Sequence, residues 1–130
     1  MTNVATPTTA DRSIALTIPA RADYLVLSRL ALAAVCRLTP LSPDDVADLK
    51  LAVTEAAADF VVDADEAEPE ERLGIAAEVL DDRLVIDVSG SRLEVPEADR
   101  ELSRAIIEAT VDDAEINADG TRLIKQLRTG

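Results

Sequence analysis

Two segments carry the pattern of a β-hairpin, and together they restrict the chain to folds built on an antiparallel sheet. Apolar residues occupy every second position over 73–79 and again over 84–88, on either side of Asp81-Asp82. The same spacing runs over 114–118, and the favoured turn Asp119-Gly120 leads into a returning strand with Leu123 and Leu127. Hairpin strands pair antiparallel, and alternation buries one face of each strand. We therefore expect a mostly antiparallel sheet with one face covered by helices.

Three further segments predict one strand and two long helices before the first hairpin. Residues 13–18 alternate up to Pro19, which indicates a half-buried strand. A Leu- and Ala-rich helix is expected over 20–38, apolar over so much of its circumference that it predicts either deep burial or an interface. The face predicted to be its apolar side is Tyr24, Leu27, Ala31, Ala34, Val35 and Leu38.

The second helix begins with a Ser42 cap and Pro43 and is expected to end near Asp63. Its apolar positions recur every three or four residues: Val46, Leu49, Val53, Ala56 and Phe60. Spacing over 96–110 predicts a third, short helix between the two hairpins. The expected order is β-α-α-β-β-α-β-β, an α+β two-layer sandwich with helices on one face. Residues 1–12 are expected to form a flexible tail and 13–130 a single domain.

Composition excludes several classes of function. The chain has 130 residues, no His, 2% aromatic residues and a formal net charge of −13. A field of that sign repels nucleic acids and anionic membranes, and few aromatic rings are available to stack on bases. His-dependent catalysis and ordinary zinc sites are absent. Cys36 lies among Ala and Val and predicts a small buried side chain. Since no signal peptide or membrane-spanning run is apparent, we expect a cytoplasmic location.

Glu55 and Asp59 stand four residues apart on one face of the second helix. Two like charges at this spacing destabilise a helix by about 0.2–0.5 kcal/mol. They fit two interpretations. One is a solvated acidic surface in an acid-rich chain, and the other is a metal or phosphoryl-transfer site.

The expected element order and two motifs resemble a known family. Ile18-Pro19-Ala20 opens the first helix, and Asp48-Leu49-Lys50-Leu51-Ala52-Val53-Thr54-Glu55-Ala56 lies in the second. Together they resemble the RsbW-type anti-sigma-factor serine kinases, which have the GHKL, or histidine-kinase-like, ATPase fold. The resemblance implies that Glu55 is a general base and that Asp59 stands where an Asn binds magnesium. An Asp keeps an oxygen ligand for that ion, although its extra charge needs a nearby cation such as Lys50.

The segments after the second helix depart from that family. Gly90 falls where an Asp recognises adenine, and Arg92 falls where a Gly follows it. No glycine occurs between Gly90 and Gly120, whereas the family has a Gly-rich turn whose amides approach the phosphates. The lid region is also short. These changes predict poor nucleotide binding.

The leading hypothesis is a divergent anti-sigma-factor-like regulator of a bacterial partner-switching pathway, which acts by protein–protein sequestration without efficient kinase activity. Its partners are expected to be a sigma factor, an anti-sigma factor antagonist, or both, and a homodimer is implied by the family. No cofactor is expected unless the site at Glu55, Asp59 and Gly90 still holds Mg-ATP. The alternatives are an active ATP-dependent serine kinase that phosphorylates an antagonist, with Glu55 as base, and a non-catalytic adaptor or dimerisation domain.

Overall fold

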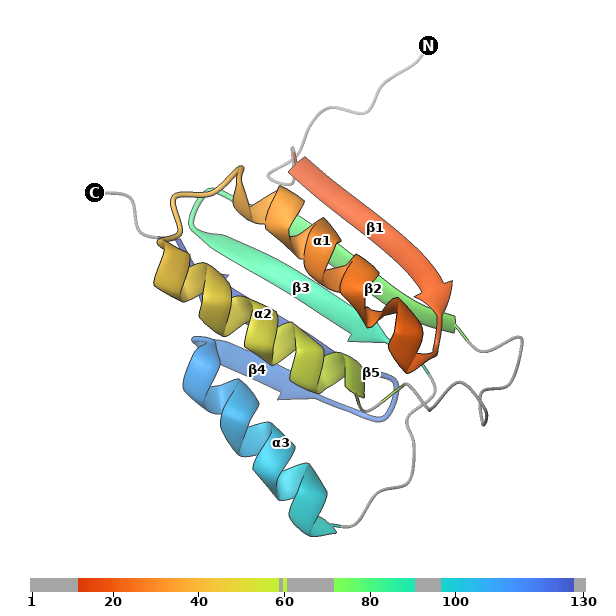
Figure 1. The fold of residues 1–130 in the computed structure, drawn as a ribbon. Helices are drawn as coiled ribbons and strands as arrows, with labels where there is room; N and C mark the ends of the chain where they lie inside the picture. Colours follow the sequence, from red (N-terminus) through yellow and green to blue (C-terminus); the bar gives the residue numbers. More distant parts are fainter. Residues whose placement is uncertain (1–11, 59, 61–71, 91–96, 128–130) are drawn as a thin grey trace.

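The computed structural model describes residues 12–58, 60, 72–90 and 97–127 (Figure 1). The elements follow the predicted order: β1 Arg12–Pro19, a 3-10 turn Ala22–Tyr24, α1 Leu25–Cys36, α2 Pro43–Ala58, β2 Arg72–Val79, β3 Arg83–Ser89, α3 Glu97–Thr110, β4 Asp113–Ile116 and β5 Gly120–Gln126. The strand β1 starts at Arg12, and the rest of the expected tail lies outside the described residues. So does the expected end of the second helix near Asp63.

The five strands form one antiparallel sheet in the order β1-β2-β3-β5-β4. The three helices lie side by side over one face of it (Figure 1). Both predicted hairpins are present. Leu80 and Arg83 close the first turn through a hydrogen bond of 2.9 Å, and the Asn117 side chain accepts bonds of 3.0 Å from the amides of Asp119 and Gly120 in the second. The predicted α+β sandwich is confirmed.

The core lies between the sheet and α2, the central helix of the layer (Figure 1). Strands β2 and β3 present the predicted alternate residues to this side, among them Leu73, Ile75, Leu84, Ile86 and Val88. The facing side of α2 is made of Leu49, Ala52, Val53, Ala56 and Ala57, all fully buried. Its three small alanines bring the helix backbone close to the sheet, so the position of the C-terminal end of α2 is fixed relative to the end of β3.

The predicted apolar face of α1 is wrong in part. Its buried residues are Ser28, Leu32, Val35 and Cys36, whereas Leu27 and Leu38 are 38% and 47% exposed. Because this helix is apolar on nearly every side, its sequence does not single out one buried face, and contact with β1 and β2 decides it. The buried Ser28 hydroxyl donates to the Leu25 carbonyl at 2.6 Å, which satisfies it within the helix. Burial of Cys36 matches the expectation.

Candidate functional site

Glu55 is half-buried on α2, beside a contact that joins α1 and α2. The neighbouring Thr54 hydroxyl donates to the Lys50 carbonyl at 2.8 Å and accepts a hydrogen bond of 3.3 Å from the Arg29 guanidinium. Arg29 therefore joins α1 to α2 at the residue that precedes Glu55 in the sequence. No local sequence pattern signals the contact between Arg29 and Thr54, because they lie on different helices and Arg29 is the one charged residue of a mostly apolar α1.

Lys50, the cation nearest to Glu55 in sequence, does not lie on the same side of α2 as Glu55. Five helical residues turn it onto a different side of α2 from Glu55. Its charge instead lowers the pKa of the Cys36 thiol, although burial is the larger effect and the pKa of Cys36 is raised on balance. The charge that Lys50 was expected to balance is that of Asp59, which lies outside the described residues.

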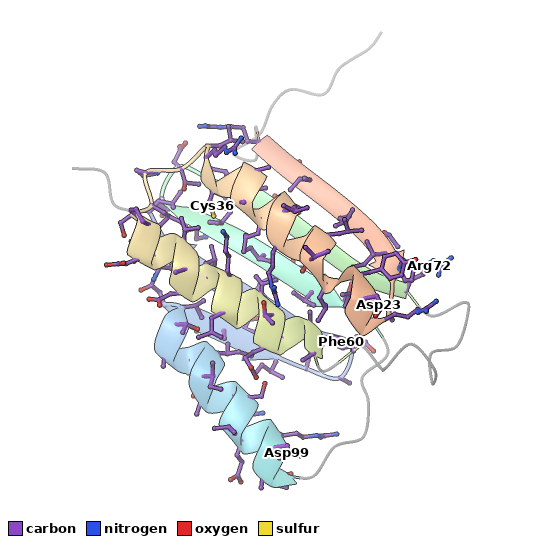
Figure 2. The ribbon with its side chains drawn as sticks, in the orientation of Figure 1. Asp23, Cys36, Phe60, Arg72 and Asp99 are labelled. Carbon is purple, nitrogen blue, oxygen red and sulfur yellow. The ribbon has the colours of Figure 1, made fainter. Side chains whose placement is uncertain are left out.

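Gly90 directly follows β3 and lies beside Phe60. Its amide donates to the Asp119 carbonyl at 3.2 Å. A Cβ atom added at Gly90 would lie 3.2 Å from the Arg72 carbonyl oxygen and 3.4 Å from both Cβ and Cδ1 of Phe60. Phe60 itself is 2% exposed and lies at the C-terminal end of α2 (Figure 2). The space in which the family's adenine-recognising side chain would begin is therefore bounded closely by a backbone carbonyl and an aromatic ring.

The helix that follows this region begins with acids. Glu97 and Asp99 lie in the first turn of α3, with Asp99 at its start in Figure 2. Acidic side chains stabilise a helix N-terminus, and the same charges repel a phosphate that approaches it. The described residues contain no group of three or more His, Cys, Asp or Glu side chains able to hold a metal ion. Asp59, the candidate magnesium ligand, and Arg92 lie outside the described residues.

The described residues show part of the site that the resemblance implies for Mg-ATP. Glu55 is on α2, next in sequence to the Thr54 that Arg29 contacts. A glycine stands at position 90, where an added Cβ atom would lie 3.2 Å from the Arg72 carbonyl oxygen and at ordinary contact distance, 3.4 Å, from Phe60, and acids stand at the start of α3. What the arrangement retains is a rigid α2 with a half-buried carboxylate. None of the described helices is both long and apolar enough to cross a membrane.

Comparison with known proteins places these observations in a family. No protein-family model matches the chain. The serine-protein kinase RsbW of Bacillus licheniformis is 31% identical over 111 residues, which cover 84% of this chain and 69% of that protein. RsbW of Bacillus cereus (strain AH187) is 36% identical over 76 residues, 58% of this chain and 47% of the relative. The chain therefore spans between about half and two thirds of the length of these relatives.

A solved structure supports the fold. The crystal structure of the RsbU and RsbW domains of a Mycobacterium tuberculosis protein superposes with a TM-score of 0.62 over 90% of this chain and 32% of that chain, at 20% identity. At that identity the likeness concerns the fold alone. Sequence and fold agree, and the chain belongs to the RsbW family of serine-protein kinases, with the GHKL-like fold.

Proposed function

We propose that this chain is an anti-sigma-factor-like regulator of a bacterial partner-switching pathway, which sequesters a protein partner and binds ATP weakly or not at all. The partner is a sigma factor, an anti-sigma factor antagonist, or both, and the site of action is the cytoplasm. Membership of the RsbW family supports the regulatory role. Family membership does not decide whether the chain binds ATP or transfers phosphate, since the residues of the nucleotide motifs depart from the family pattern.

The contact between Gly90 and Phe60 is the observation that carries this proposal. An adenine-binding site needs a hydrogen-bonding group aimed at the base and room for the base beside it. Glycine supplies no such group, and a Cβ atom at this position would lie in tight contact with the Arg72 carbonyl oxygen, at 3.2 Å, and in ordinary contact with the Phe60 ring, at 3.4 Å. The two acids at the start of α3 add a charge cost for triphosphate.

Exposed apolar side chains on α1 support the proposal that the chain binds a protein. Val26 and Leu30 of α1 are 52% and 61% exposed, although large apolar side chains are more often buried. They offer a contact for a second copy of the chain, as in a homodimer, or for another protein. The net charge of −13 attracts a basic partner surface and accelerates the encounter at low salt.

Calorimetric titration with Mg-ATP tests the proposal. The range should extend to about millimolar dissociation constants, roughly −4 kcal/mol of binding free energy. We expect no saturation in folded protein, together with nucleotide-independent binding of a cognate sigma factor or antagonist in a pull-down with purified components. Saturable ATP binding in the micromolar range would refute the loss of the nucleotide site, and failure to bind any sigma factor or antagonist of the same genome would refute the regulatory role.

One observation favours the active kinase as a second candidate. Glu55, the candidate base, is half-buried on α2, next in sequence to the Thr54 that accepts a hydrogen bond from Arg29. If the chain transfers phosphate to an antagonist serine, Glu55→Gln should abolish transfer and leave partner binding unchanged, while Glu108→Gln, on the exposed side of α3, should have no effect. Absence of transfer by the unmodified chain with Mg-ATP would exclude this candidate.

A further inference from the structure

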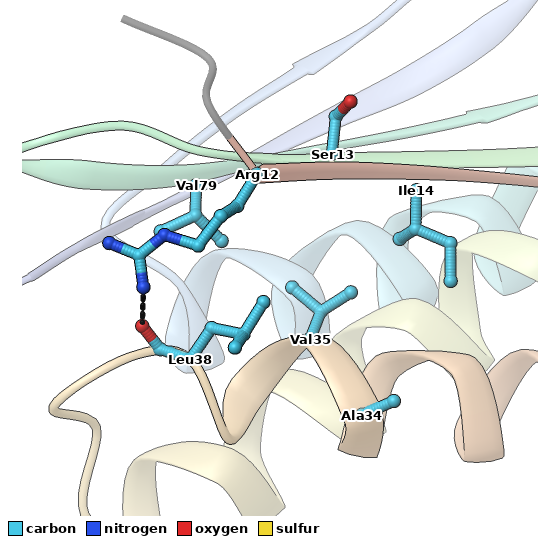
Figure 3. Close-up of a pocket in the computed structure, with 7 residues that line it drawn as sticks. All are labelled: Arg12, Ser13, Ile14, Ala34, Val35, Leu38 and Val79. Atoms are coloured by element: carbon cyan, nitrogen blue, oxygen red, sulfur yellow. Dashed lines mark hydrogen bonds between the residues drawn. The ribbon is translucent and has the colours of Figure 1, made fainter.

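A cavity of ≈ 250 Å³ opens between the start of β1 and the C-terminal part of α1 (Figure 3). Gly90 follows Ser89, which pairs with Gly74 of β2, and Gly74 pairs with Thr17 near the end of β1. The cavity is near Arg12, at the opposite end of β1. It is therefore separate from the candidate nucleotide site. The lining is mostly aliphatic and consists of Arg12, Ser13, Ile14, Ala34, Val35, Leu38 and Val79.

Arg12 is the charged group of this lining. Its Nη1 donates to the Leu38 carbonyl at 3.0 Å, which fixes the guanidinium at the rim (Figure 3). A guanidinium has five N–H donors, so this bond leaves most of its donor capacity available. The planar fork matches a carboxylate, which it can bind through two parallel hydrogen bonds.

Some of the described arginines pair with a carboxylate and others, Arg12 among them, do not. Arg21, Arg83 and Arg122 each pair with an Asp, at 3.8, 2.9 and 2.8 Å. Within the described ranges, Arg12 has no such partner, although the whole chain has 26 acidic residues. An unpaired cation beside an aliphatic cavity is complementary to an amphiphilic anion.

We propose that this cavity binds a small aliphatic monocarboxylate, with the hydrocarbon chain between Ile14, Ala34 and Val35 and the carboxylate on Arg12. The volume lies below the roughly 300–1,000 Å³ of clefts for drug-sized ligands, which indicates a chain of only several carbons. A neutral hydrocarbon would leave Arg12 unused. A second copy of the chain is also negatively charged, but no observation identifies which of its carboxylates would contact Arg12. The proposal is independent of the proposed regulatory function.

Calorimetry with butanoate, hexanoate and octanoate, and with hexan-1-ol as a neutral analogue, tests this site. Each added methylene should lower the dissociation constant about three- to fourfold until the cavity is full. Hexanoate should bind about tenfold more tightly than hexan-1-ol, because a charge-assisted hydrogen bond is worth more than a neutral one. A dissociation constant that does not depend on chain length, or equal binding of acid and alcohol, would overturn the proposal.

Three variants locate the site. Arg12→Gln should remove the preference for acid over alcohol and keep the dependence on chain length. Ala34→Leu, at an exposed position on the rim, should fill the cavity and abolish binding of both ligands. Arg37 is an exposed arginine at the C-terminal end of α1 and does not line the cavity. Arg37→Gln is therefore the matched control and should bind both ligands as the unmodified chain does.

Circular dichroism and light scattering complete the test. All variants should have unchanged spectra, since none of the three positions is buried. If no carboxylate binds and Ala34→Leu instead changes the molar mass in light scattering, the surface is a self-association contact and the proposal is wrong. If carboxylates bind equally to all four proteins, they bind elsewhere, and it is likewise wrong.

Discussion

Phe60 determines the stability of the region around Gly90. Its side chain is 2% exposed and contacts the end of β3, so Phe60→Ala should leave a cavity and lower the free energy of unfolding by about 3–5 kcal/mol. Phe60→Leu keeps most of the volume and should cost clearly less. Urea denaturation measures both. A loss below about 1 kcal/mol for Phe60→Ala would show that the site collapses without cost, and would weaken the argument that Phe60 limits room for adenine.

Cys36 should make stability fall at alkaline pH. Burial raises the pKa of its thiol in the folded state, so above about pH 8.5, the ordinary pKa of an unfolded thiol, the unfolded chain releases a proton that the folded chain keeps. The unfolded state then binds fewer protons, and the free energy of unfolding declines as pH rises toward the folded pKa. Below the unfolded pKa this contribution is fully present.

The measurement for Cys36 is the difference between urea midpoints at about pH 7.5 and about pH 9.5, under reducing conditions. Cys36→Ala has no thiol to titrate, so its decline over this interval should be smaller than that of the unmodified chain. An equal decline in both proteins would assign the alkaline effect to other groups.

At the scale of elements, the start of α2 depends on Ser42. The Ser42 hydroxyl accepts a hydrogen bond of 3.1 Å from the Asp45 amide, and its carbonyl accepts one of 2.9 Å from Val46. Ser42→Ala should lower the free energy of unfolding by about 1 kcal/mol, whereas Ser42→Gly should cost only a few tenths, roughly 0.3 kcal/mol. Because Ser42 is exposed, no packing is lost in either variant. Equal losses for both, measured by urea denaturation, would contradict a capping role.

The elements could be predicted from the sequence where their signals are local. Period-two alternation over 73–79 and the turn Asp119-Gly120 each lie within a few residues, and both predicted hairpins are present. The buried side of α1 could not be predicted, because leucines such as Leu27 and Leu32 point in several directions and the sheet selects among them. Contacts of the site, Arg29 with Thr54 and Gly90 with Phe60, join segments at least 25 residues apart, and no local pattern encodes them.

Across the whole molecule, the chain has the fold of the RsbW family, and the proposed loss of nucleotide binding concerns side chains outside the core. The core is packed by Leu49 and Val53 of α2 against Leu84 and Ile86 of the sheet. Gly90 and the acids of α3 lie at the ends of elements, where substitution costs little packing. The proposed loss of nucleotide binding is therefore compatible with the observed fold.

The net charge of −13 should make stability increase with ionic strength. Folding brings acidic residues closer together, and within the described part of the chain only some of them have cationic partners, such as Asp87 with Arg122 at 2.8 Å. Raising NaCl from about 0.01 to about 0.1 M shortens the Debye length from about 30 to about 10 Å and screens this repulsion. We expect the urea midpoint at pH 7 to rise with salt. Glu108→Lys, which replaces an exposed negative charge by a positive one, should reduce that rise, and a midpoint that falls with salt would show that ion pairs outweigh self-repulsion.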